Sequence, residues 1–165
     1  MESRRTELKW GLIFVAVQLA WMGLERVVGL HGTHIDLHMA LTNLFAIPAI
    51  AVYVFALHDK KRNDLGGVMS YREGFISGLV ISLVVTVLSP ATQWITSTII
   101  TPDYFENAIA YSVESGFHDS VEEARAYFNL RNYLLQAAVG GLVMGVLTSA
   151  IVAFFLRSRG ERPPV

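Results

Sequence analysis

Long hydrophobic stretches dominate the sequence and carry few charged side chains. They fall at residues 10–30, 38–57, 72–100 and 131–156. A helix needs about 20 largely apolar residues to cross the hydrocarbon core of a bilayer, and its hydrogen bonds satisfy every backbone group there. The pattern therefore predicts an all-α fold: a four-helix transmembrane bundle that forms a single integral membrane domain over residues 1–165.

The first stretch follows a basic segment, which a cleaved signal peptide would also have. No convincing small-x-small cleavage site precedes Glu25 and Arg26. We therefore expect the first stretch to be retained as a membrane span.

Residues 101–130 form the only sizeable segment predicted to lie outside the membrane. Phe105, Ile109 and Val113 recur every four residues and predict one amphipathic helix, which Gly116 would end. The stretch 120–123 has the Ser-x-x-Glu spacing of a capping box and predicts a second helix that leads into the fourth span. This short helical hairpin is expected to cover the ends of the spans; the alternative is a surface that binds a partner.

Lysine and arginine are distributed unequally between the two sides of the predicted bundle. Cytoplasmic loops of membrane proteins carry an excess of these residues. The excess lies in the N-terminal segment, in the loop after the second span and in the C-terminal segment, at Arg4, Arg5, Lys9, Lys60, Lys61, Arg62, Arg72, Arg157, Arg159 and Arg162. The asymmetry predicts that both termini lie in the cytoplasm and that residues 101–130 lie outside it.

Composition narrows the classes of function. Hydrophobic residues make up 53% of the chain and charged residues 16%, which fits lipid as the surrounding solvent. The net charge of −1 leaves no basic face for a nucleic-acid partner. The chain has no cysteine, which excludes disulfides, thiolate metal ligands and cysteine nucleophiles.

Small residues recur every four positions along spans three and four. The two stripes include Gly74, Gly78 and Ser82 in one span and Gly141, Gly145 and Ser149 in the other. Small side chains let two membrane helices approach closely, as in GxxxG packing. We expect the two spans to pack against each other; the alternative is that one stripe forms a homodimer contact.

Glu25 and Arg26 lie near the outer end of the first span, and charged residues at membrane depth are rare and usually paired. Arg26 can extend to water along its aliphatic stem, whereas Glu25 needs a partner. Gln93, Arg131 and a loop histidine are the candidates. An interfacial ion pair that fixes the helix rotation is the first interpretation, and a functional acid is the second.

The first outer loop concentrates imidazole and carboxylate groups. His31, His34, Asp36 and His38 lie within eight residues. His34 and His38 would share a face of a helix, and imidazoles at this spacing bind Zn²⁺ and related metals. No HExxH motif is present, and histidines are common at wet interfaces, so the prediction is no cofactor, with a divalent metal site as the alternative.

Several stretches resemble a family of bacterial membrane proteins catalogued as domain of unknown function 4199, found mainly in Bacteroidetes and their relatives. The similarity lies in residues 29–32, 59–62, 71–78, 88–90, 100–105, 126–130 and 145–150. The resemblance covers nearly the whole chain. It implies a four-span protein of the bacterial inner membrane and brings no activity or site residue.

No catalytic motif is present, so the chain is not expected to be an enzyme. The first functional hypothesis is a protein that acts through helix packing and assembly, with the lipid bilayer and a homo-oligomer or another membrane protein as partners. The alternative is a small transporter, or a metal-responsive or pH-responsive protein, that uses Glu25 and the outer histidines.

Overall fold

The computed structural model describes residues 4–158, and they fold into helices joined by short turns, with no strand in that range. The predicted all-α fold is confirmed. The α-helices are α1 (Arg5–Val27), α2 (Ile35–Leu41), α3 (Ala46–Asp59), α4 (Tyr71–Ile95), α5 (Tyr104–Glu114), α6 (Val121–Tyr127) and α7 (Leu130–Leu156). A 3-10 turn, Thr42–Phe45, joins α2 to α3, and π-helical turns extend α3 and α4 at Lys60–Asp64 and Thr96–Ile100.

Four helical segments are long and apolar enough to cross a membrane, as the sequence predicted: Arg5–Val27, Ile35–Asp64, Tyr71–Ile100 and Leu130–Leu156. The second is longer at both ends than residues 38–57. It begins at Ile35 because α2 continues through the 3-10 turn into α3, and it ends at Asp64 because the π-helical turn adds a charged end.

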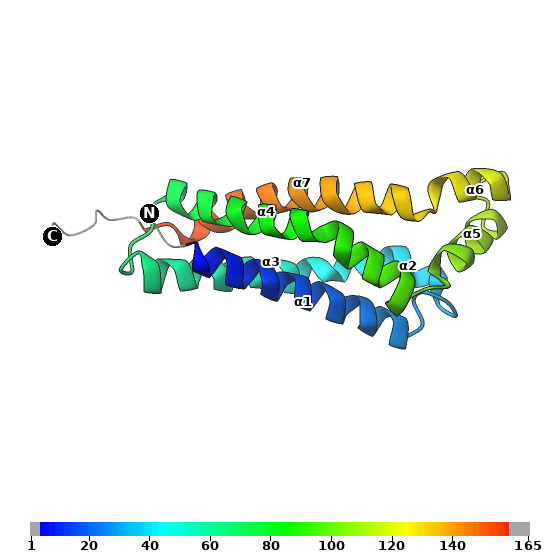
Figure 1. The fold of residues 1–165 in the computed structure, drawn as a ribbon, viewed down its shortest axis with the longest axis horizontal. Coiled ribbons are helices and arrows are strands. Elements are labelled where there is room, and N and C mark those ends of the chain that lie inside the picture. Colours follow the sequence, from blue (N-terminus) through cyan, green and yellow to red (C-terminus); the bar gives the residue numbers. More distant parts are fainter. Residues whose placement is uncertain (1–3, 159–165) are drawn as a thin grey trace.

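The spans run side by side along the length of the molecule (Figure 1). Helix α1 begins and α7 ends at one end, which we call the inner end. Helices α5 and α6 lie at the opposite end, which we call the outer end.

Helices α4 and α7 make the most extensive helix contact within residues 4–158. The Cβ that a side chain would add at Gly78 lies 2.6 Å from Ser149 Cβ, and one at Gly145 lies 2.7 Å from Ser82 Cβ. The Tyr53 hydroxyl of α3 lies 2.8 Å from Ser82 Oγ. The inner halves of both small-residue stripes therefore pack within the chain, at a spacing that only small residues allow.

In contrast, the glycines in the outer half of α7 are not packed against another helix of the described chain. Gly140 is exposed and Gly141 is partly exposed, and no atom of residues 4–158 outside the local helix lies within 4 Å of the position that a Cβ would occupy there. Pro90 lies inside α4, and a proline ring clashes with the preceding turn of a helix and bends it. Figure 1 shows α4 and α7 diverging toward the outer end.

Helices α5 and α6 are short helices of their own and do not continue into the fourth span. Helix α5 ends before Gly116, which adopts a left-handed φ of 76°. Helix α6 does not run into α7, contrary to the expectation. Asn129 has an extended backbone and its side chain accepts a hydrogen bond from Asn132 N at 3.0 Å, so it caps α7 as a new helix.

Candidate metal centre

Glu25 lies in the last turn of α1 with only 1% of its surface exposed. Trp21 is one turn earlier, and its Nε1 donates a hydrogen bond to Glu25 Oε1 at 2.5 Å. The Thr42 side chain also lies beside the carboxylate. Burial and the Trp21 donor fix the carboxylate and leave its second oxygen, Oε2, facing the outer loop.

The chain after α1 folds back over Glu25. Gly29 adopts a left-handed φ of 83°, and Leu30 N donates to the Glu25 carbonyl oxygen at 2.9 Å. This is the glycine-terminated end that many helices use. Asn107 Nδ2 of α5 donates to the His31 carbonyl oxygen at 2.8 Å, so the loop is held from both sides.

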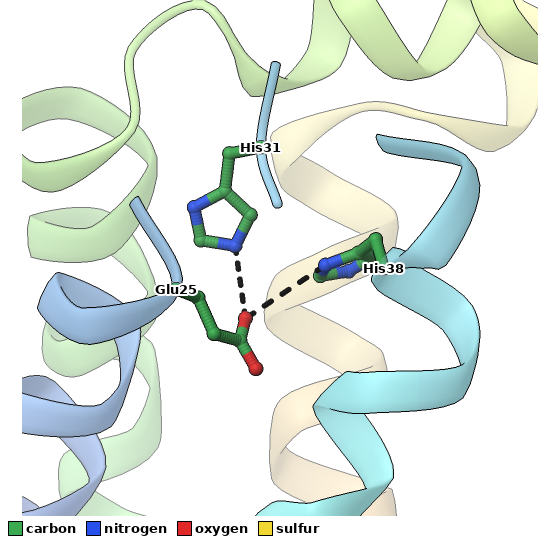
Figure 2. Close-up of side chains that lie close together, drawn as sticks. All are labelled: Glu25, His31 and His38. Carbon is green, nitrogen blue, oxygen red and sulfur yellow. Dashed lines mark hydrogen bonds and ion pairs between the residues drawn. The ribbon is translucent and has the colours of Figure 1, made fainter. Parts of the chain in front are cut away.

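Two imidazoles converge on Glu25 as a result (Figure 2). His31, from the loop, places Nε2 at 2.9 Å from Glu25 Oε2. His38, from α2, places Nδ1 at 3.8 Å from the same oxygen. His31 is 8% exposed and His38 20% exposed. The sequence named a loop histidine as a partner for Glu25, and the structure supplies two.

One donor atom from each of these residues lies within 4.8 Å of the other two. Within residues 4–158, His38 Nδ1 is buried without a hydrogen-bond partner, although it faces the carboxylate. Zn²⁺ binds nitrogen and oxygen donors at about 2.0–2.2 Å, so small side-chain movements would close the three donors around one ion. We call Glu25, His31 and His38 the outer cluster.

Tyr104 of α5 forms a wall of the outer cluster. Its ring centroid lies 5.2 Å from those of both His31 and His38. Its hydroxyl lies 3.2 Å from the Tyr133 hydroxyl. Burial raises the pKa of Tyr104 above its usual value, so the phenol stays protonated and neutral beside the carboxylate.

Cavities adjoin the outer cluster on two sides, and Tyr104 lines both. One of about 220 Å³ reaches His31 and is otherwise polar, with Arg26 and Asn107 in its lining. The other, of about 400 Å³, reaches His38 and Thr42 and extends between α2, α5, α6 and the start of α7. A ligand in either cavity would lie against an imidazole of the cluster.

The other polar residues singled out from the sequence lie elsewhere. His34 and Asp36 are exposed, and His34 precedes α2 with a non-helical backbone, so it does not share a helical face with His38. Arg26 donates to the Ile100 carbonyl oxygen. Gln93 Nε2 donates to Ser97 Oγ at 2.9 Å. Of the predicted metal ligands, the structure brings only His31 and His38 together, with Glu25 as the carboxylate.

A second buried polar group, which the sequence analysis missed, lies at the inner end. Glu7 of α1 is fully buried, and Lys60 Nζ lies 3.1 Å from Glu7 Oε1 and 3.0 Å from Asp64 Oδ2. Ser77 Oγ donates to Glu7 Oε1 at 2.8 Å. We call these residues the inner cluster. The spacing of the two glutamates could have predicted the burial of Glu7. Glu7 precedes Glu25 by 18 residues, or about five helical turns, and so lies on the same face of α1.

A family model described as a protein of unknown function (DUF4199) matches residues 9–158. The chain belongs to the DUF4199 family. The region matched to DUF4199 contains the whole outer cluster and begins two residues after Glu7. No curated protein and no solved structure matches the chain.

Proposed function

We propose that this DUF4199 protein binds a divalent transition metal of the Zn²⁺ class at its outer cluster. The observation that carries the proposal is the convergence of one carboxylate and two imidazoles within 4.8 Å, in a buried setting where His38 Nδ1 has no hydrogen-bond partner among residues 4–158. Two histidines with one glutamate are an established Zn²⁺ ligand set that leaves a fourth position open.

The donor set favours a transition metal over Ca²⁺ or Mg²⁺, which prefer sites made of oxygen atoms. Trp21 supports the proposal as an outer-shell partner that orients a metal-binding carboxylate. An ion there would tie together the end of α1, the loop and α2. We propose a binding role without enzymatic activity, since the sequence carries no catalytic motif.

The test is a Zn²⁺ titration of the purified protein in lipid nanodiscs, after treatment with a chelator. The expected result is one tight site per chain, with much weaker Zn²⁺ affinity in Glu25→Gln and in His38→Ala. His34→Ala is the matched control, because His34 lies in the same segment but is exposed. Equal Zn²⁺ affinity in all three variants and the wild type would overturn the proposal.

We propose the bacterial inner membrane as the location, with both ends of the chain in the cytoplasm. The support is the excess of Lys and Arg at the inner end. The chain has no cysteine, so single cysteines can report the orientation. In intact spheroplasts, a membrane-impermeant maleimide should label Ser115→Cys and spare Asn63→Cys, both of which are exposed positions; the reverse pattern would contradict this orientation.

A second candidate function is assembly with another membrane helix, through the outer half of α7. The support is the open space beside Gly140 and Gly141, which lie in a span and have no neighbour among residues 4–158 at their Cβ positions. The partner is a second copy of the chain or another membrane protein. Cross-linking in native membranes should yield a complex that Gly141→Leu abolishes and Gly23→Leu, at another open position, preserves. An unchanged complex in both variants would exclude this surface.

A further inference from the structure

The cavity on the His38 side, which we call the aromatic pocket, differs in character from the cluster that it adjoins. Rings from three helices line it, including Tyr104 and Tyr111 of α5, Tyr127 of α6 and Tyr133 of α7. Among the described residues, no Asp, Glu, Lys or Arg side chain belongs to its lining. Its volume of about 400 Å³ falls within the range of small-molecule sites. Its chemistry suits an uncharged aromatic or aliphatic body.

The aromatic pocket and the outer cluster meet at His38 and Thr42. His38 supplies one of the three metal donors and also lines the pocket. Thr42 lies beside Glu25 and lines the pocket as well. A metal held by three protein ligands has a fourth position to fill. A molecule seated in the pocket would therefore lie against His38, one of the residues that would hold the ion.

We infer that the aromatic pocket and the metal of the outer cluster together bind a hydrophobic carboxylate. The carboxylate completes the coordination of the ion, and the apolar body lies among the tyrosine and phenylalanine rings. The inference rests on the proposed metal site. Two sources share this chemistry, a planar aromatic acid from the aqueous phase and a fatty acid from the bilayer.

Binding of the carboxylate and of Zn²⁺ must be reciprocal, because each ligand changes the affinity of the other by the same factor. The probes are 2-naphthoate and decanoate, and methyl 2-naphthoate is the control that lacks the anionic donor. The readout is the Zn²⁺ dissociation constant in nanodiscs with and without each probe. We expect the acid that fits the pocket to tighten Zn²⁺ binding about fivefold or more, and the methyl ester to have no effect. The acid with the larger factor identifies the source.

Matched variants locate the effect in the pocket. Ala108 is buried and lines the pocket, whereas Ala110 on the same helix is exposed. Ala108→Phe should bind Zn²⁺ as the wild type does and lose the response to the acid, and Ala110→Phe should keep both. Ser112→Leu fills the pocket at a second buried position, in case Ala108→Phe does not fold.

The outcomes separate the two proposals. Tight Zn²⁺ binding that neither acid alters overturns the inference and leaves the proposed function intact. A response that survives in both Ala108→Phe and Ser112→Leu places the acid elsewhere and also overturns the inference. If the chain binds the acid but not Zn²⁺, the metal ion has no role at the outer cluster, and both proposals are overturned.

Discussion

Helix α1 carries a buried glutamate at each end, and the two differ in what surrounds them. Glu7 lies at the inner end against Lys60, with Lys60 Nζ 3.1 Å from its carboxylate. Glu25 lies at the outer end against His31 and His38. An ammonium group has three donors and no lone pair, so it neutralises a carboxylate and supplies no ligand atom to a metal. A neutral imidazole has a lone pair, so the same carboxylate beside two imidazoles becomes a ligand set.

The two clusters on this face of α1 therefore differ in role: the inner one joins helices, and the outer one offers ligands to a metal ion. The inner cluster ties α1 to α4 through Ser77 and to the end of the second span through Lys60. The outer cluster ties α1 to α2 with weaker direct contacts, since His38 Nδ1 is 3.8 Å from Glu25 Oε2. The inner cluster therefore already contains a cation, although Glu7 Oε2 is buried without a hydrogen-bond partner among residues 4–158. The outer cluster contains no Lys or Arg side chain, and a bound metal ion would supply the positive charge.

The largest effect is expected at the inner cluster. Lys60→Met leaves Glu7 charged and buried without its main partner, and breaking one side of a buried ion pair costs about 3–5 kcal/mol. Thermal unfolding in detergent should show this loss. The double variant Lys60→Met with Glu7→Gln should recover most of the stability, because the buried carboxylate is then uncharged and Asp64, the other partner of Lys60, is exposed. A single variant as stable as the wild type would show that the inner cluster does not stabilise the fold.

Zn²⁺ should stabilise the protein through the outer cluster alone. At about 100 times its dissociation constant, a ligand specific for the folded state adds about 2.7 kcal/mol. The wild type should therefore gain stability on adding Zn²⁺, and Glu25→Gln should not. Glu7→Gln should be less stable than the wild type without Zn²⁺, but Zn²⁺ should raise its free energy of unfolding by the same amount. If Zn²⁺ stabilises Glu25→Gln as much as the wild type, the two glutamates do not differ in the proposed way.

A smaller effect is expected from the tryptophans that donate hydrogen bonds at the two ends of α1. Trp21 Nε1 donates to Glu25, and Trp10 Nε1 donates to Asp59 at 2.7 Å. Losing an outer-shell partner weakens metal affinity about tenfold to a hundredfold. Trp21→Phe should therefore weaken Zn²⁺ binding to that extent, while Trp10→Phe leaves the dissociation constant unchanged. Equal effects of both variants would remove the argument that Trp21 orients the ligand.

The smallest effect is expected at the histidine that the structure leaves outside the outer cluster. His34 is exposed, so His34→Ala should change the unfolding free energy by less than about 0.5 kcal/mol. Its Zn²⁺-dependent stabilisation should equal that of the wild type. A loss of that stabilisation would mean that the ion binds on the loop surface and not at Glu25.

The sequence predicted the four spans because apolar length is a strong signal in membrane proteins, and it identified Glu25 as an acid in need of a partner. It could not select among the histidines. Their placement depends on the reversal at Gly29, which brings His31 back over Glu25 and leaves His34 outside the helix. Glu7 was missed because it lies in a basic segment that resembles a solvated tail. Its burial depends on Lys60 and Ser77, which are distant in sequence.

X-ray absorption at the zinc edge, on the protein loaded with one equivalent of Zn²⁺ in nanodiscs, tests directly whether Glu25, His31 and His38 bind the ion. We expect a first shell of nitrogen and oxygen at about 2.0–2.2 Å, with the scattering of two imidazoles. We also expect one imidazole fewer in His31→Ala and in His38→Ala, and an unchanged spectrum in His34→Ala. A shell without imidazole scattering, or one that neither His31→Ala nor His38→Ala alters, would show that the ion does not bind at the outer cluster.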